Sequence, residues 1–185
     1  KVSSEMGRVM EYVYDMGPTD DGREIIARYD SELLKSDRVM FTDGNGLEDI
    51  KRVYREDSVM PVSANYYPIS NRAWMQSKDE SLRLSLVVDR GHRSQKHDLE
   101  NAIDRGHGVA SVIDGVFEVM LRRRSRGDDG FGVDEPLTEN DHYQQTLWLM
   151  LGAPKTSVAL HKRLDFHLNH TPVPFFFVTE KPLAH

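Results

Sequence analysis

Residues 82–88 read Leu-Arg-Leu-Ser-Leu-Val-Val and carry the strongest strand signal in the chain. Leucine or valine stands at positions 82, 84, 86 and 88, alternating with Arg83, Ser85 and Val87. A two-residue hydrophobic period is typical of a β-strand with one face toward the core. A polar segment at 77–80 precedes this stretch and indicates a turn. Residues 82–88 therefore predict a core strand of a sheet.

Similar strand patterns recur on both sides of this stretch. They predict strands over 8–14, 23–29, 38–42, 74–77 and 116–121. The first two are separated by a Gly-Pro break and an Asp-Asp-Gly turn, which favours a hairpin or a piece of a meander.

Other segments leave two alternatives open. Residues 47–54 fit either a helix or a strand, and so do 143–151 and 157–168. The polar stretch near 93–106 has no strand pattern and predicts a short helix or a loop inserted between the strands. Two copies of Asp-Arg-Gly-His, at 89–92 and 104–107, flank this insertion.

The chain has 185 residues and a mass of 21.2 kDa, enough for one good core. About eight to ten short strands with a turn every eight to twelve residues predict an all-β fold. We expect an antiparallel β-sandwich over residues 1–170, with a barrel as the alternative. Residues 171–185 contain three prolines and are expected to form an extended tail.

Composition excludes several classes of protein. The net charge is −6 and the pI about 5.7, which argues against a nucleic-acid partner. The absence of cysteine excludes disulfides and thiolate metal sites. No apolar run approaches the ~20 residues of a membrane span, so no membrane partner is expected. The chain starts at Lys1, which we interpret as a processed product or a piece of something larger. Asn169 begins a glycosylation sequon.

Three sets of residues are candidates for metal or catalytic sites. Asp43 to Glu48 has spaced oxygen ligands, but a hairpin turn is favoured over a calcium loop. His92, His97 and His107 fit either a zinc cluster or a polar loop with scattered histidines, and the loop is favoured. A pair of catalytic carboxylates was considered among Asp89, Asp104, Asp114 and Glu118. Spacing alone promotes none of these candidates, and no metal site is expected.

The sharpest local feature is the basic run Arg122-Arg123-Arg124-Ser125-Arg126, followed by two aspartates. If the preceding strand continues into it, alternate arginines point to opposite faces. One arginine then pairs with an aspartate by a bidentate contact, and another reaches a site outside this domain. A solvated charge run is the alternative reading.

Several motifs together resemble a known family. They lie at 11–14 with 17–18, at 41–46 with 51–52, at 64–68, at 88–90 with 114–129, and at 132–140. In this order they are similar to the C-terminal half of glycoside hydrolase family 38, the lysosomal and Golgi class II α-mannosidases. The connection over 91–113 departs from the short loop of the family, and an insertion would explain it.

The resemblance implies a galactose-mutarotase-like portion of a zinc-dependent retaining α-mannosidase that acts on mannose-containing glycans. In the family, zinc and the nucleophilic aspartate belong to an N-terminal domain whose motifs are absent here. The resemblance therefore implies a scaffold that binds no cofactor itself, is inactive when isolated, and has the rest of the mannosidase polypeptide as its partner. A lysosomal or vacuolar location is implied by the subgroup. The alternative is a non-catalytic carbohydrate-binding or interaction module.

The resemblance also gives the basic run a role. An arginine of the matching Arg-Arg pair reaches the substrate side of the cleft in the family. We expect Arg123 to face the substrate and Arg124 to pair with Asp128 or Asp129 on the other face, or the reverse. Two sets of residues are predicted to be structural: turn-forming Asp43 and Asn45, and Asn65, Tyr66 and Tyr67 inside the sandwich. A partial sheet with open edges predicts poor stability or self-association of the chain alone.

Overall fold

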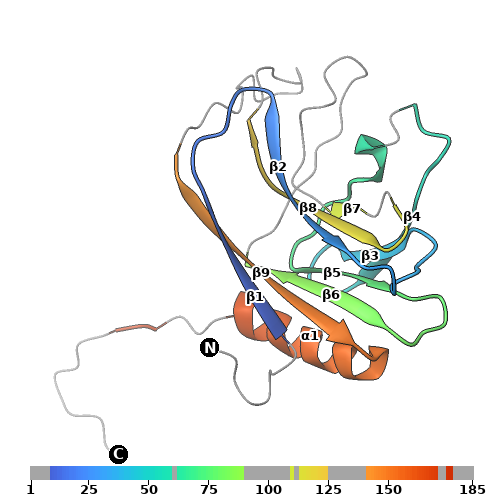
Figure 1. Ribbon diagram of the computed structural model, residues 1–185. Helices are drawn as coiled ribbons and strands as arrows, with labels where there is room; N and C mark the ends of the chain where they lie inside the picture. Colours follow the sequence, from blue (N-terminus) through green and yellow to red (C-terminus); the bar gives the residue numbers. More distant parts are fainter. Residues whose placement is uncertain are drawn as a thin grey trace, which may run out of the picture.

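The computed structural model describes residues 9–59, 62–89, 109–110, 113–124, 141–170 and 174–176. Two antiparallel sheets pack against each other, and one helix lies on the outer face of the larger sheet (Figure 1). The predicted all-β sandwich is confirmed.

The larger sheet has six strands in the order β1-β9-β6-β5-β3-β4. In that order they are β1 (Val9–Met16), β9 (Tyr143–Gly152), β6 (Arg83–Val88), β5 (Arg72–Gln76), β3 (Val39–Asp43) and β4 (Asp49–Val53). The smaller sheet has the order β2-β8-β7, with β2 (Arg23–Asp30), β8 (Val116–Arg124) and β7 (Val109–Ala110). A 3₁₀ turn, η1 (Ser63–Asn65), and the helix α1 (Pro154–Asn169) complete the described elements.

The core lies between the two sheets. Phe117 and Val119 of β8 face Leu86 of β6 and Leu147 of β9, and all four side chains are at most 1% exposed. Burial of apolar side chains of this size contributes roughly 1.5–3 kcal/mol each. This interior is what the alternating leucines of residues 82–88 predicted.

Strand β6 is buried on both faces, which the alternation alone did not reveal. Helix α1 covers the outer face, where Leu164 packs with Val9, Val87 and Met150 in a second small core. The helix begins at Pro154, in the first turn, where the missing N–H costs nothing. Segment 157–168 is therefore helical, one of its two predicted alternatives.

The predicted hairpin of residues 8–14 and 23–29 is wrong. Strand β1 pairs with β9, and β2 pairs with β8, so the two segments lie in different sheets. The Gly-Pro break and the following turn carry the chain across the sandwich instead of reversing it within one sheet. Segments 47–54 and 143–151 form strands.

Two further predictions concern parts of the chain that the structure leaves out. The short helix or loop near 93–106 lies outside the described residues, as does most of the predicted tail at 171–185. In the described part of the chain, no helix combines the length and apolar character that crossing a bilayer requires.

Candidate functional site

The three arginines that end β8 lie where the strand runs along β2. A β-bulge interrupts the pairing: Ile25 is opposite Arg122 and Ile26 is opposite Met120, so Leu121 has no partner. The bulge inserts one extra residue into β8, and the consecutive residues Leu121 and Arg122 are both buried. Arg122, Arg123 and Arg124 are therefore shifted by one residue relative to the in-and-out alternation that begins at Val116.

Arg122 is anchored to the backbone. Its Nη1 donates to the carbonyl oxygens of Gly17, at 3.0 Å, and of Asp141, at 2.5 Å. Its guanidinium lies 5.8 Å from the ring of Tyr143. These contacts join the β1–β2 connection, the start of β9 and the end of β8 into one corner.

Arg123 and Arg124 make different contacts. Arg123 is opposite Glu24 in the ladder and forms an ion pair with that carboxylate. Only 3% of its side chain is exposed. The Nε of Arg124 lies 2.6 Å from Asp21, and its Nη1 donates to the carbonyl of Thr19. Asp128 and Asp129, the predicted partners, lie outside the described residues.

Glu118 lies earlier in β8 than Arg123 and is a second polar residue of that strand. Its carboxylate accepts a 2.7 Å hydrogen bond from the Tyr66 hydroxyl and pairs with Arg28 of β2. Burial and then the Glu118 carboxylate raise the pKa of Tyr66, so the phenol stays protonated and donates. The face around Arg123 thus carries alternating acidic and basic groups in direct contact.

A second polar centre lies where the Asp43 turn meets β5. The Asp43 carboxylate is 1% exposed and accepts hydrogen bonds from the backbone N–H groups of Gly46, Ser70, Asn71 and Arg72, at 2.8 to 3.2 Å. A carboxylate that several backbone amides bind in this way fixes the local chain direction. Asp43 therefore forms the hairpin turn, as predicted, and also ties that turn to β5.

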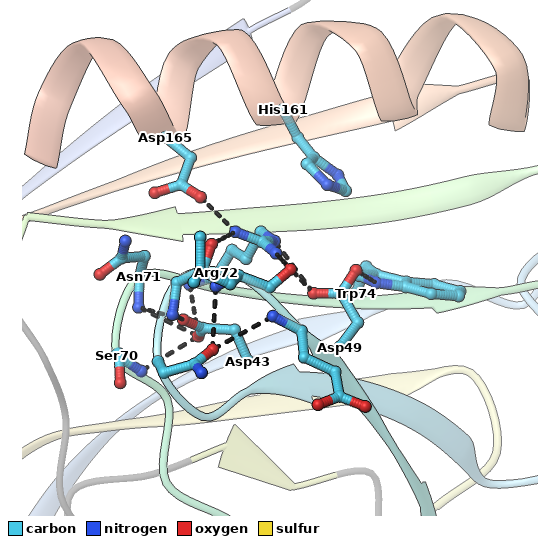
Figure 2. A network of polar contacts seen from close by, with 12 residues as sticks. Asp43, Asp49, Ser70, Asn71, Arg72, Trp74, His161 and Asp165 are labelled. Atoms are coloured by element: carbon cyan, nitrogen blue, oxygen red, sulfur yellow. Dashed lines mark hydrogen bonds and ion pairs between the residues drawn. The ribbon is translucent and has the colours of Figure 1, made fainter. Parts of the chain in front are cut away.

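Arg72 links this centre to the helix (Figure 2). Its buried guanidinium pairs with Asp165 of α1 and, at 2.9 Å, with Asp49 of β4, and it donates to the carbonyl of Gly46. Burial acts to lower the pKa of Arg72, but Asp165, Asp49 and Asp43 together raise it above its ordinary value. The ion network therefore fastens α1 and the β3–β4 hairpin to the same strand.

Trp74 and His161 extend the network along β5 and β6. The Trp74 indole donates to Asp49 at 3.1 Å, stacks on Phe41 at 3.7 Å, and carries the Arg83 guanidinium 3.4 Å from its centroid. At those distances Phe41 and Arg83 must cover opposite faces of the ring. Trp74 is therefore no open sugar-stacking platform.

His161 points from α1 toward this network (Figure 2). Its Nδ1 lies 3.1 Å from the Ser85 hydroxyl, and its Nε2 is buried with no hydrogen-bond partner in the described part of the chain. Burial, followed by the charges of Arg83 and Arg72, lowers the pKa of His161 to about 4. The imidazole is therefore neutral near pH 7, which avoids a third adjacent cation.

Several known proteins are similar in sequence to this chain. No family model matches the chain. Lysosomal α-mannosidase of Dictyostelium discoideum is 30% identical over 90% of the chain, and α-mannosidase of Canavalia ensiformis is 38% identical over 70% of it. Lysosomal α-mannosidase of Homo sapiens is 32% identical over 72% of the chain.

The chain is related to one segment of the α-mannosidases. It spans only 16%, 12% and 12% of the lengths of these three relatives. The resemblance to family 38 carried by the motifs is thereby confirmed.

The mannosidase-like motifs prove to be largely structural where the structure describes them. Asn65 is buried and exchanges hydrogen bonds with the backbone of Arg55, and Tyr67 packs against the core, as predicted. Asp89 accepts a hydrogen bond from the Thr146 amide, and Asp114 accepts one from the Ser36 amide. Neither of these aspartates is placed as a catalytic pair partner of Glu118, which binds Tyr66.

Sequence reasoning missed the Arg72 network. The signal was present in part, because Asp43 lies in a quoted motif, but Arg72 and Asp165 are 93 residues apart and no local pattern joins them. The proposed histidine cluster at 92, 97 and 107 lies outside the described residues, as does Asp104. Among the described residues, no three His, Asp or Glu side chains are grouped so that they could hold a metal ion.

Proposed function

We propose that this chain is the sandwich part of a retaining α-mannosidase that hydrolyses α-linked mannose from glycoprotein glycans. The chain supplies scaffold and residues that border the substrate cleft, and the catalytic centre belongs to the rest of the mannosidase polypeptide. A lysosomal or vacuolar location is part of the proposal, since several of the similar proteins are lysosomal α-mannosidases.

The observation that carries the proposal is the identity of 30–38% with α-mannosidases over 70–90% of the chain. The described residues supply a scaffold and not a catalytic centre of their own. Their buried acids serve backbone amides or arginines: Asp43 binds four amides, and Asp165 binds Arg72. Zinc is assigned to none of the described residues, because no three of their His, Asp or Glu side chains are grouped so that they could hold a metal ion.

The corner that ends β8 is the proposed border of the cleft. Arg123 and Arg124 are held by ion pairs with Glu24 and Asp21, which fix the orientation of the two guanidinium groups. An arginine fork presents several fixed donors, which suits sugar hydroxyl groups. Two arginines held in place by ion pairs at the end of a strand are therefore what this scaffold contributes to the neighbouring site.

The test is hydrolysis of an aryl α-mannoside by the longest protein expressed from the gene that contains this chain. We expect turnover of the α-mannoside and none of the β-mannoside or α-glucoside controls. Activity that prefers another glycoside, or no glycosidase activity in that protein, would contradict the proposal.

Variants of that protein test the role of the corner. Arg123→Lys keeps the charge and removes the fork, whereas Glu24→Gln removes the ion pair and keeps the arginine. If Arg123 contacts the sugar, Arg123→Lys lowers kcat/KM at least about tenfold, the loss expected for a charge-assisted hydrogen bond, with an unchanged melting temperature. Equal effects of the two variants on stability, with kcat/KM unchanged, would make the pair structural.

A further inference from the structure

An open hollow of about 600 Å³ lies beside the edge strand β4, and none of its lining residues belongs to the β8 corner or pairs with Arg72. It is lined by residues of β4, of the segment that follows β4, and by Tyr67. Three of the lining side chains are cationic: Lys51, Arg52 and Arg55. Such a concentration of positive charge is unexpected on a chain whose net charge is −6.

Arg52 is built into the wall of this hollow. Its Nε donates to the hydroxyl of Thr42, a fully buried residue, at 3.0 Å. Its Cζ lies 4.7 Å from the centroid of the Tyr67 ring, so the plane of the guanidinium is supported on an aromatic surface. Both contacts fix the orientation of the fork. In the described part of the chain, no carboxylate pairs with Arg52, so its two terminal nitrogens remain as donors.

The acidic groups of the hollow do not balance its cations. Glu56 forms an ion pair with Arg38, which itself stacks on Tyr54 with 4.4 Å between Cζ and the ring centroid. With Glu56 paired outside the lining, Asp57 is the remaining carboxylate among the lining side chains, against the three cations Lys51, Arg52 and Arg55.

The electrostatic setting of Arg52 agrees with this imbalance. Partial burial lowers the pKa of Arg52, and the charge of Arg55 lowers it further, against the opposing influence of Tyr67. A bound anion would relieve this repulsion, because an opposite charge within a few ångströms favours the charged form of the arginine.

From this geometry we infer that the hollow beside β4 is a binding site for a small oxyanion, a carboxylate or a phosphate group carried by an acidic ligand. The fork of Arg52 binds two oxygens of that group, a geometry that arginine favours with carboxylate and phosphate. Lys51 and Arg55, both exposed, add positive charge at the rim. The inference does not depend on the proposed mannosidase function, because it concerns residues that the proposal does not use.

The test is a titration of the full chain at low ionic strength, followed by the side-chain ¹⁵N signals of its arginines. The probes are inorganic phosphate, glucuronate, and glucose as the uncharged control for the sugar ring. We expect phosphate or glucuronate to shift the Arg52 signal saturably and glucose to leave it in place. Binding of phosphate alone identifies a phosphate site, and binding of glucuronate identifies a carboxylate site.

Variants give the decisive comparison. Arg52→Gln is expected to weaken binding about tenfold to a hundredfold, and Arg52→Lys is expected to recover only part of it. Arg163→Gln, which removes one exposed charge from α1, is the matched control and should change affinity less than about twofold. If Arg52→Gln does not fold, the exposed Arg55→Gln and Lys51→Gln variants test the same hollow. Affinity unchanged in these variants, or no preference for the anions over glucose, would overturn the inference.

Discussion

Replacing Arg72 with methionine is the sharpest perturbation of this fold. Arg72 is 3% exposed and holds two carboxylates, those of Asp165 and Asp49, together with the carbonyl oxygens of Gly46 and Leu47. Methionine fills much of the same volume but donates no hydrogen bond. The variant therefore leaves two negative charges and two carbonyls facing an apolar side chain.

The expected cost follows from the burial of these groups. Removal of one partner from a buried ion pair costs about 3–5 kcal/mol, since the remaining charge is left uncompensated. That loss is a large part of the ~5–15 kcal/mol that stabilises a typical domain. Because Asp165 belongs to α1 and Asp49 to β4, the variant should loosen the helix and the hairpin together.

The assay is urea unfolding followed by tryptophan fluorescence, with Trp74 reporting next to the network. Arg28→Met is the matched control, because the Arg28–Glu118 pair is at the surface and the Arg28 side chain is 44% exposed. We expect the control to lose less than ~1 kcal/mol. A loss below ~1 kcal/mol for Arg72→Met as well would refute the claim that this network fastens α1 to the sheet.

Three further predictions follow from the same structure. Because the pKa of His161 is about 4 in the folded chain and near 6.5 when unfolded, the unfolded state binds the extra proton first, so the free energy of unfolding should fall by up to about 3 kcal/mol between pH 6.5 and 4. Urea titrations should show a smaller fall for His161→Gln, and equal slopes would contradict the assignment. Gly115→Ala places a Cβ 2.5 Å from a backbone carbonyl at a φ of +83° and should prevent folding, whereas Gly22→Ala, at a φ of +69° in open space, should cost ~1 kcal/mol in thermal unfolding. The edge strand β1 exposes Met10 and Val13 at 46% and 51%, so the chain alone should self-associate in sedimentation experiments, and Val13→Lys should reduce that association. A monodisperse wild-type chain at all concentrations would oppose this expectation.

The strands could be predicted from the sequence because their signal is local. Alternation at 82–88 reflects a core that one face of β6 shares with β8 and β9. The pairing partners could not be predicted, because the 8–14 segment pairs with a strand more than a hundred residues later in the chain. Val9, for example, lies opposite Met150. The second buried face of β6 was hidden as well, since it depends on where α1 docks.

The candidate site likewise has a part that the sequence indicated and a part that it did not. Arg123 and Arg124 were proposed from a basic run and a resemblance, whereas the bulge at Leu121 and the ion pairs with Glu24 and Asp21 follow from contacts that the sequence does not reveal. The Arg52 hollow was not found, although residues 51–52 lie in a quoted motif, because no local pattern joins them to Tyr67 across the fold. Only the support of Arg52 by Thr42 and Tyr67 distinguishes it.

The most direct test of the central claim is the hydrolysis of 4-nitrophenyl α-mannoside, measured side by side for the 185-residue chain and for the longest protein expressed from its gene, each with and without added zinc. The account predicts no turnover by the isolated chain in either condition and α-specific turnover by the longer protein. Turnover by the isolated chain, confirmed as a single species, would show a catalytic centre within these residues and contradict the assignment of this segment to the scaffold.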